Sequence, residues 1–104
     1  MTALFLAFAI ASEVAATLAL KASDGLSRPV PAAIVVAGYA LSFWLLALVL
    51  KHLSVGTTYA VWSAVGTAAI ALVGIVAYGE TANALKLASL ALIIAGVIGL
   101  NAAH

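Results

Sequence analysis

Cysteine is absent from this chain of 104 residues, and charged side chains make up only 7% of it. The lack of cysteine excludes disulfides and metal sites built on thiolates. A formal net charge of +1 offers no basic patch for nucleic acid. The two histidines, His52 and His104, lie far apart near segment ends, so we expect them to be solvated or interfacial and predict neither a metal nor another cofactor. No nucleophile–base pair is visible, which argues against an enzyme.

Hydrophobic residues dominate what remains. They make up 67% of the chain, and the mean hydropathy is +1.32. A soluble domain of this size needs a polar coat, because its surface is large relative to its volume. Four Lys/Arg and three Asp/Glu residues cannot supply that coat. The composition therefore predicts an integral membrane protein.

The charges divide the chain into apolar segments. Six of the seven charged residues fall into three clusters, at positions 21–28, 51 and 80–86. A helix needs about 20 apolar residues to cross a bilayer. The stretches between the clusters therefore predict one all-α domain, residues 1–104, with four transmembrane helices at about residues 2–20, 30–50, 54–78 and 85–102.

Glu13 is the one charge that lies inside a predicted span. An acidic side chain there costs about 2.5–3.5 kcal/mol on insertion scales. Such a residue usually faces a cavity or a partner, and we expect it to mark an ion or substrate path, although a neutral glutamic acid could also bond neighbouring helices together. Ala9 and Thr17 share its helix face and leave room for a ligand. A cleavable signal peptide over residues 1–23 is disfavoured, because Glu13 interrupts its apolar centre.

Aromatic residues in the predicted helix 54–78 suggest a binding wall. Tyr59 and Trp62 are three residues apart and so share a face. Aromatic rings beside a carboxylate can hold a lipophilic cation by cation–π attraction, worth about 0.5–2 kcal/mol each. The alternative is an interfacial belt, but both residues lie deeper in the span than a belt requires.

Two further helices carry polar, aromatic or small residues of interest. In the predicted helix 30–50, Ser42 could form a hydrogen bond with Trp62 or Glu13, and two aromatic residues could line the cavity or face lipid: Tyr39 and Phe43. In the predicted helix 85–102, Ser89 and Gly96 are seven residues apart on one face. Small residues at that spacing let helices approach closely, so we predict that this helix forms an assembly interface.

Together these segments resemble the small multidrug resistance family of bacterial transporters over essentially the full chain. The carrying segments are Ala11-Ser12-Glu13-Val14 with Thr17 and Lys21, Ser42-Phe43-Trp44-Leu45-Leu46, Tyr59-Ala60-Val61-Trp62-Ser63-Ala64-Val65-Gly66, and Ala95-Gly96-Val97 with Asn101. The chain departs from the family pattern at Ala64 and Ser89, where glycine is common; both are exchanges of one small residue for another.

The resemblance implies a proton-coupled antiporter that works as an antiparallel homodimer in the bacterial inner membrane. In the family, protons and substrate share the glutamate that corresponds to Glu13, and the substrate-binding aromatic residues correspond to Tyr59 and Trp62. The expected substrates are quaternary ammonium and other lipophilic cations. Ala9, Ala16 and Thr17 look like that subtype, whereas guanidinium exporters usually have a glycine and a tryptophan at the positions of Ala9 and Ala16.

Three alternatives remain open at this point. The first is a guanidinium exporter of the same family. The second is one half of an obligate heterodimer, which needs a second gene product. The third is an accessory membrane subunit or a pore former without proton coupling, for which replacement of Glu13 by Gln would be silent.

Overall fold

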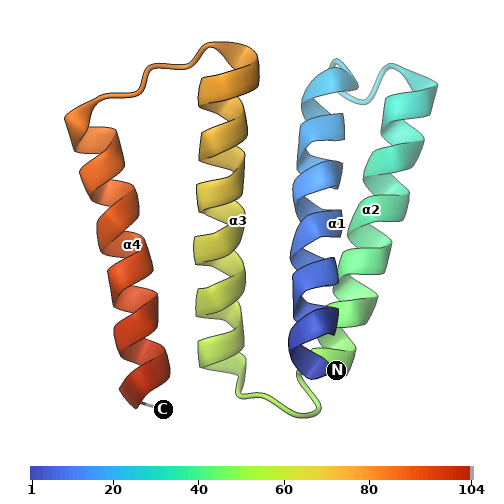
Figure 1. The fold of residues 1–104 in the computed structure, drawn as a ribbon. Helices are drawn as coiled ribbons and strands as arrows, with labels where there is room; N and C mark the ends of the chain where they lie inside the picture. Colours follow the sequence, from blue (N-terminus) through green and yellow to red (C-terminus); the bar gives the residue numbers. More distant parts are fainter. Residues whose placement is uncertain (104) are drawn as a thin grey trace. The chain divides into compact units, whose positions relative to one another are not determined.

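Four long helices, and no strands, make up residues 1–103, the part of the chain that the computed structural model describes (Figure 1). They are α1 (Thr2–Ala22), α2 (Pro29–Val49), α3 (Val55–Tyr78) and α4 (Ala84–Ala103). Each is long and apolar enough to cross a membrane. The predicted all-α architecture with four membrane-spanning helices is therefore confirmed, while His104 lies outside the described residues.

The helix ends follow local backbone chemistry. Pro29 takes the first position of α2, where its missing N–H breaks no helical hydrogen bond. Gly79 ends α3 with a φ of +65°, a left-handed conformation that glycine adopts without a Cβ clash. α1 runs past the expected end at residue 20 to Ala22, with Lys21 in its last turn. A cation at that position interacts favourably with the carbonyl end of the helix.

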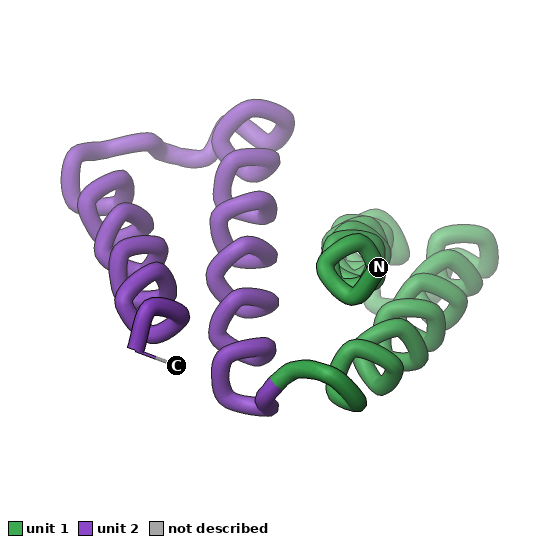
Figure 2. The backbone as a smooth tube through the Cα atoms, turned by 60° about the horizontal axis from the view of Figure 1, so that its bottom comes forward, with its two compact units in different colours: residues 1–53 green, residues 54–104 purple. Residues whose placement is uncertain are grey.

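The chain divides into two compact units, residues 1–53 and 54–104 (Figure 2). The first unit is the hairpin of α1 and α2, and the second is the hairpin of α3 and α4. Each unit is an antiparallel helix pair joined by a short connection, as expected for consecutive membrane spans (Figure 1).

Close contact between α1 and α2 holds the first unit together. An added Cβ at Gly38 would lie 2.8 Å from Ala16 Cβ and 3.2 Å from the carbonyl oxygen of Ser12. The missing side chain at residue 38 therefore lets the two backbones approach. Elsewhere in this contact Ser42 Oγ donates a hydrogen bond of 2.7 Å to the carbonyl oxygen of Ala9, and both residues are fully buried.

The turn between α1 and α2 is organised by Ser23, which is also fully buried. Its Oγ donates to the carbonyl oxygen of Leu20 at 2.7 Å and accepts from the N–H of Leu26 at 2.9 Å. Asp24, Gly25 and Leu26 have φ values of 50°, 71° and 68°. The Ser23 hydroxyl thus anchors three consecutive left-handed residues, of which only the glycine adopts that conformation without steric cost.

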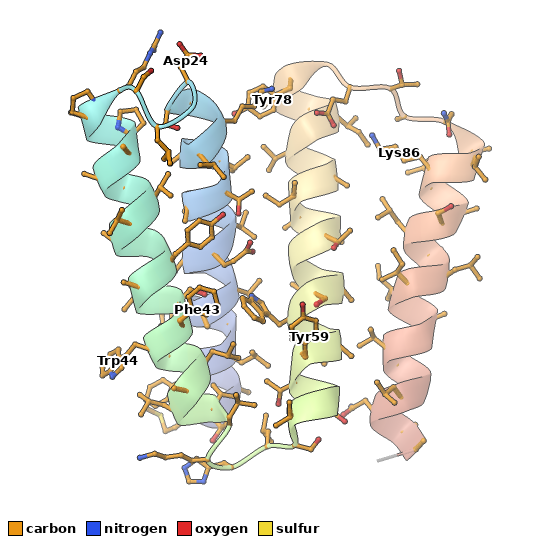
Figure 3. All side chains as sticks on the ribbon, turned by 180° about the vertical axis from the view of Figure 1, so that it is seen from behind. Asp24, Phe43, Trp44, Tyr59, Tyr78 and Lys86 are labelled. Carbon is orange, nitrogen blue, oxygen red and sulfur yellow. The ribbon has the colours of Figure 1, made fainter. Side chains whose placement is uncertain are left out.

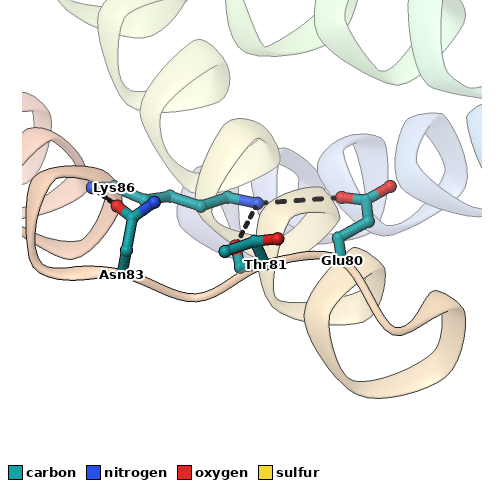
Figure 4. Close-up of polar contacts among 4 residues, drawn as sticks. All are labelled: Glu80, Thr81, Asn83 and Lys86. Atoms are coloured by element: carbon teal, nitrogen blue, oxygen red, sulfur yellow. Dashed lines mark hydrogen bonds and ion pairs between the residues drawn. The ribbon is translucent and has the colours of Figure 1, made fainter.

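In the second unit, polar contacts organise the connection between α3 and α4 (Figure 4). Asn83 Oδ1 accepts a hydrogen bond of 2.8 Å from the N–H of Lys86, as the cap of α4. Lys86 Nζ donates to the carbonyl oxygen of Thr81 at 3.1 Å and lies 3.8 Å from Glu80 Oε1. α4 itself has no buried residue among those described. Its apolar sides are therefore open to lipid or to another chain.

Replacing Gly38 with Ala should lower the free energy of unfolding by about 1–3 kcal/mol, the usual cost of overfilling a packed contact. The added methyl would meet a Cβ and a backbone carbonyl, neither of which can rotate away. Reversible unfolding in mixed detergent micelles measures the effect. Gly56→Ala is the matched control, because an added Cβ there meets nothing within 4 Å. An equal free energy of unfolding in the two variants would contradict a tight contact between α1 and α2 at Gly38.

Candidate functional site

Glu13 lies at the middle of α1 and is half-buried. Its Oε1 accepts a hydrogen bond of 2.9 Å from the hydroxyl of Thr17, one helical turn further along α1. Thr17 Oγ1 also lies 2.7 Å from the hydroxyl oxygen of Tyr39 on α2. Three side chains from two helices therefore form one continuous line of hydrogen bonds that ends on the carboxylate.

The carboxylate keeps capacity for a ligand. Thr17 occupies one lone pair of Oε1, whereas an ionised carboxylate has about four acceptor sites on its two oxygens. α2 carries no charged residue, and the other charged residue of α1 is Lys21, eight positions after Glu13. At 1.5 Å per residue this is about 12 Å along the helix axis. Within the described residues, no three His, Cys, Asp or Glu side chains gather as a metal site would require.

Ala9 and Ser42 lie in the interior of the α1–α2 contact. Both are fully buried, and the Ser42 hydroxyl donates to the backbone of Ala9. The sequence suggested a hydrogen bond with Trp62 or Glu13, whereas the hydroxyl hydrogen of Ser42 is donated to the backbone of Ala9. The reason is geometric, since Ser42 faces α1 one turn away from the level of Glu13. A direct contact of Ala9 or Ser42 with substrate stays a prediction.

Phe43 lies beside Tyr39 on α2. Their ring centroids are 6.3 Å apart with an interplanar angle of 28°. Phe43 is 55% exposed, so its ring covers Tyr39 and still presents a surface outside the helix pair. Trp44, the next residue, is also exposed and points away from α1 (Figure 3). Trp44 thus lies on a different side of α2 from the stacked pair of Tyr39 and Phe43 (Figure 3).

Tyr59 and Trp62 form a pair of their own on α3. Their ring centroids are 5.7 Å apart at an interplanar angle of 79°, an edge-to-face contact. Tyr59 is 62% exposed and Trp62 is half-buried. The predicted shared face is therefore observed, and the pair offers aromatic surface next to two hydrogen-bond donors.

Ser89 and Gly96, the predicted interface residues, lie on the exposed surface of α4. Ser89 Oγ donates to the carbonyl oxygen of Leu85 at 2.7 Å, which satisfies its hydroxyl within the helix. A Cβ added at Gly96 would meet nothing within 4 Å. Both positions are therefore open to a second chain.

Sequence reasoning missed Gly38 as a structural residue of this site. It precedes Tyr39, and its contact partner Ala16 precedes Thr17, so this close approach of the two helices adjoins the bond between Thr17 and Tyr39. A signal was present, because glycine inside a helix is about 1 kcal/mol less favourable than alanine. Its place at the centre of α2 indicates close packing.

Comparison with known proteins gives a consistent set of relatives. Residues 1–93 match the family described as Small Multidrug Resistance protein. The chain is 47% identical over 95 residues to a multidrug transporter of Pseudomonas aeruginosa, covering 91% of this chain and 86% of the relative. It is 43% identical over 98 residues to quaternary ammonium compound-resistance protein QacE of Escherichia coli, covering 94% and 89%. It is 48% identical over 89 residues to a guanidinium exporter of Escherichia coli, covering 86% and 85%.

Proposed function

This chain belongs to the small multidrug resistance family, and from that premise we propose that it exports quaternary ammonium and other lipophilic cations in exchange for protons. It is a multi-pass protein of the bacterial inner membrane and a transporter rather than an enzyme. The observation that carries the proposal is the half-buried carboxylate of Glu13 at the centre of a membrane span.

The exchange of a proton for a cation follows from their binding to one carboxylate. A carboxylate in a low-dielectric setting gains from binding either a proton or a cation, because either one neutralises its charge. Both ligands use the same oxygens, so they compete. Binding of a cation then releases a proton, and by linkage protonation releases the cation. A proton gradient across the membrane is thereby converted into export.

The aromatic pair of α3 supplies a surface suited to such substrates. Tyr59 and Trp62 offer ring faces for cation–π attraction and donors for hydrogen bonding. A bulky cation without N–H groups cannot donate hydrogen bonds to the protein. Aromatic area and one negative charge are then the main sources of affinity. We assign Tyr59 and Trp62 to the substrate wall, with Phe43 as a further exposed ring.

A guanidinium exporter is the second candidate, and the 48% identity to a protein of that name supports it. The packing of α1 favours the export of quaternary ammonium and other lipophilic cations. Ala16 is fully buried, and an added Cβ on Gly38 would already come within 2.8 Å of its Cβ, so this position has no space for a tryptophan. Expression in a sensitive strain, challenged with guanidinium and with a set of bulky quaternary ammonium compounds, separates the two candidates by which challenge the cells survive.

We further propose that two copies assemble antiparallel through α4. This helix has no buried residue, and Ser89 and Gly96 lie exposed on one of its faces. Small residues allow close packing, which drives association where lipid removes the hydrophobic contribution. A heterodimer would need a second gene product. Activity of the purified single chain in liposomes would exclude that requirement.

Substrate affinity should fall as the pH is lowered and level off at high pH, because protons and cation compete for Glu13. Addition of tetraphenylphosphonium to weakly buffered, purified protein should release protons. Glu13→Gln should abolish both release and export, whereas Glu13→Asp should keep binding with an altered pH dependence. Glu80→Gln is the control, since Glu80 lies outside the spans. Affinity that stays constant between about pH 5 and 9 would refute the exchange mechanism.

Trp62→Leu should strongly weaken export of aromatic cations while assembly persists, because the variant loses the ring face and the indole N–H. Resistance in cells and binding to purified protein measure the effect, with crosslinking as the test of assembly. Trp44→Leu is the matched control, because Trp44 is 61% exposed and points away from α1 (Figure 3). Normal export by Trp62→Leu would instead support a membrane-anchoring role.

The chain should insert into the membrane in both orientations. The first and third connections, together with the helix ends that flank them, carry Lys21, Arg28 and Lys86, against Lys51 at the second connection. Three cations against one are a weak bias by the positive-inside rule. An antiparallel pair needs both insertions, and a weak bias permits them.

The absence of cysteine makes the orientation directly measurable. Ser27→Cys and Ser54→Cys each introduce one thiol at an exposed residue outside the helices, on opposite sides of the membrane. An impermeant maleimide should label part of each variant in intact cells. Full labelling of one variant and none of the other would contradict dual insertion.

A further inference from the structure

We infer that Thr17 and Tyr39 are positioning residues for the proton on Glu13 and act as a relay of two hydroxyl groups. The inference rests on the proposed function in one respect, that Glu13 is the site where the proton is exchanged. It replaces the simpler expectation that these two side chains belong to the substrate wall. Its basis is the line of hydrogen bonds from α2 to the carboxylate.

Counting hydrogen atoms gives the line a direction. The Thr17 hydroxyl has one hydrogen, which it donates to Glu13 Oε1 at 2.9 Å. The contact of 2.7 Å between Thr17 Oγ1 and the Tyr39 hydroxyl must then be donated by Tyr39, because Thr17 has no hydrogen left. Both hydroxyl hydrogens therefore point towards the carboxylate, and Tyr39 has none available for another acceptor.

Protonation at Oε1 reverses this direction without moving a heavy atom. The new O–H of Glu13 donates to Thr17 Oγ1, and the Thr17 hydrogen turns to the oxygen of Tyr39. The Tyr39 hydrogen is then released and can be donated elsewhere. The polarity of the Tyr39 hydroxyl on α2 thus depends on whether Glu13 on α1 carries a proton. Tyr39 reports that state from one helix to the other.

The packing around the relay keeps its geometry. Ala16 and Gly38, the residues that precede Thr17 and Tyr39, lie at the close approach of α1 and α2. On its other side Tyr39 stacks against Phe43 at 6.3 Å. The two hydroxyls are therefore held in register by backbone contact on one side and by an aromatic ring on the other.

The relay is the main polar influence that α2, the helix packed against α1, exerts on Glu13. Tyr39 is the one titratable group on α2, which carries no charge. On α1 itself, the other charged residue is Lys21, two turns beyond Glu13. The Thr17 hydroxyl stabilises the ionised carboxylate directly, since a bond to a charged acceptor is about twice as strong as a neutral one. The Tyr39 hydroxyl acts through Thr17, because each bond of such a chain polarises the next.

Removing the relay should therefore make Glu13 hold its proton up to a higher pH. The chain has two glutamates, Glu13 and Glu80, so a Glu80→Gln protein labelled with ¹³C at the glutamate carboxyl reports on Glu13 alone. Titration in lipid bicelles then follows the carboxyl carbon shift with no substrate present. Thr17→Val, which keeps the shape of threonine, should raise the half-titration pH by about one unit, the effect of one charged hydrogen bond.

The relay further predicts how the variants combine. Tyr39→Phe should raise the half-titration pH by less than Thr17→Val, because it removes the outer hydroxyl only. Tyr39→Phe added to Thr17→Val should change nothing further, since the outer hydroxyl acts through the inner one. Thr17→Ser should restore the native titration. A native titration in Thr17→Val, or additive shifts in the double variant, would overturn the relay.

Cation affinity separates a relay from a substrate wall. Tetraphenylphosphonium binding at high pH, where Glu13 is already ionised, should keep its native affinity in Thr17→Val and Tyr39→Phe. A loss of that plateau affinity with an unchanged titration would assign both residues to the wall and refute the inference. The titration itself needs no transport. Absence of export by the native protein would therefore overturn the proposed function and leave the relay standing.

Discussion

A carboxylate inside a hydrocarbon layer must take its hydrogen-bond partners from the protein, because lipid offers none. That requirement connects most of what the first unit contains. Glu13 is met by the Thr17 hydroxyl, and Thr17 in turn by Tyr39. The second bond crosses from α1 to α2, so the two backbones have to stay close. Gly38 makes that approach possible by presenting no side chain to Ala16.

The two helix hairpins differ in how closely their helices pack against each other. In the first, small and polar residues pack α1 against α2, and Ser42 even donates to the backbone of the opposite helix. In the second, α4 buries nothing among the described residues, and its small residues remain exposed. A closely packed hairpin holds the Glu13 carboxylate in a defined geometry. A hairpin with an open helix is suited to assembly, which is the role we propose for α4.

Several features were predictable from sequence because they depend on local composition. Six of the seven charges lie between the apolar stretches, so hydropathy alone predicts four spans. The helix ends were close for a similar reason, since Pro29 and Gly79 act on the backbone beside them. Glu13 stood out because a charge in a span is rare and costly. The shared face of Tyr59 and Trp62 followed from helical spacing.

Only the tertiary structure decided which residues meet across helices. Thr17 and Tyr39 are 22 positions apart, and Ser42 and Ala9 are 33 apart. Such pairings depend on how each helix is rotated about its axis. In a soluble protein, the contrast between polar and apolar faces indicates that rotation. In a membrane, the side facing lipid and the side facing a neighbouring helix are both apolar, so the sequence leaves the rotation open, and close packing and hydrogen bonds between helices determine it.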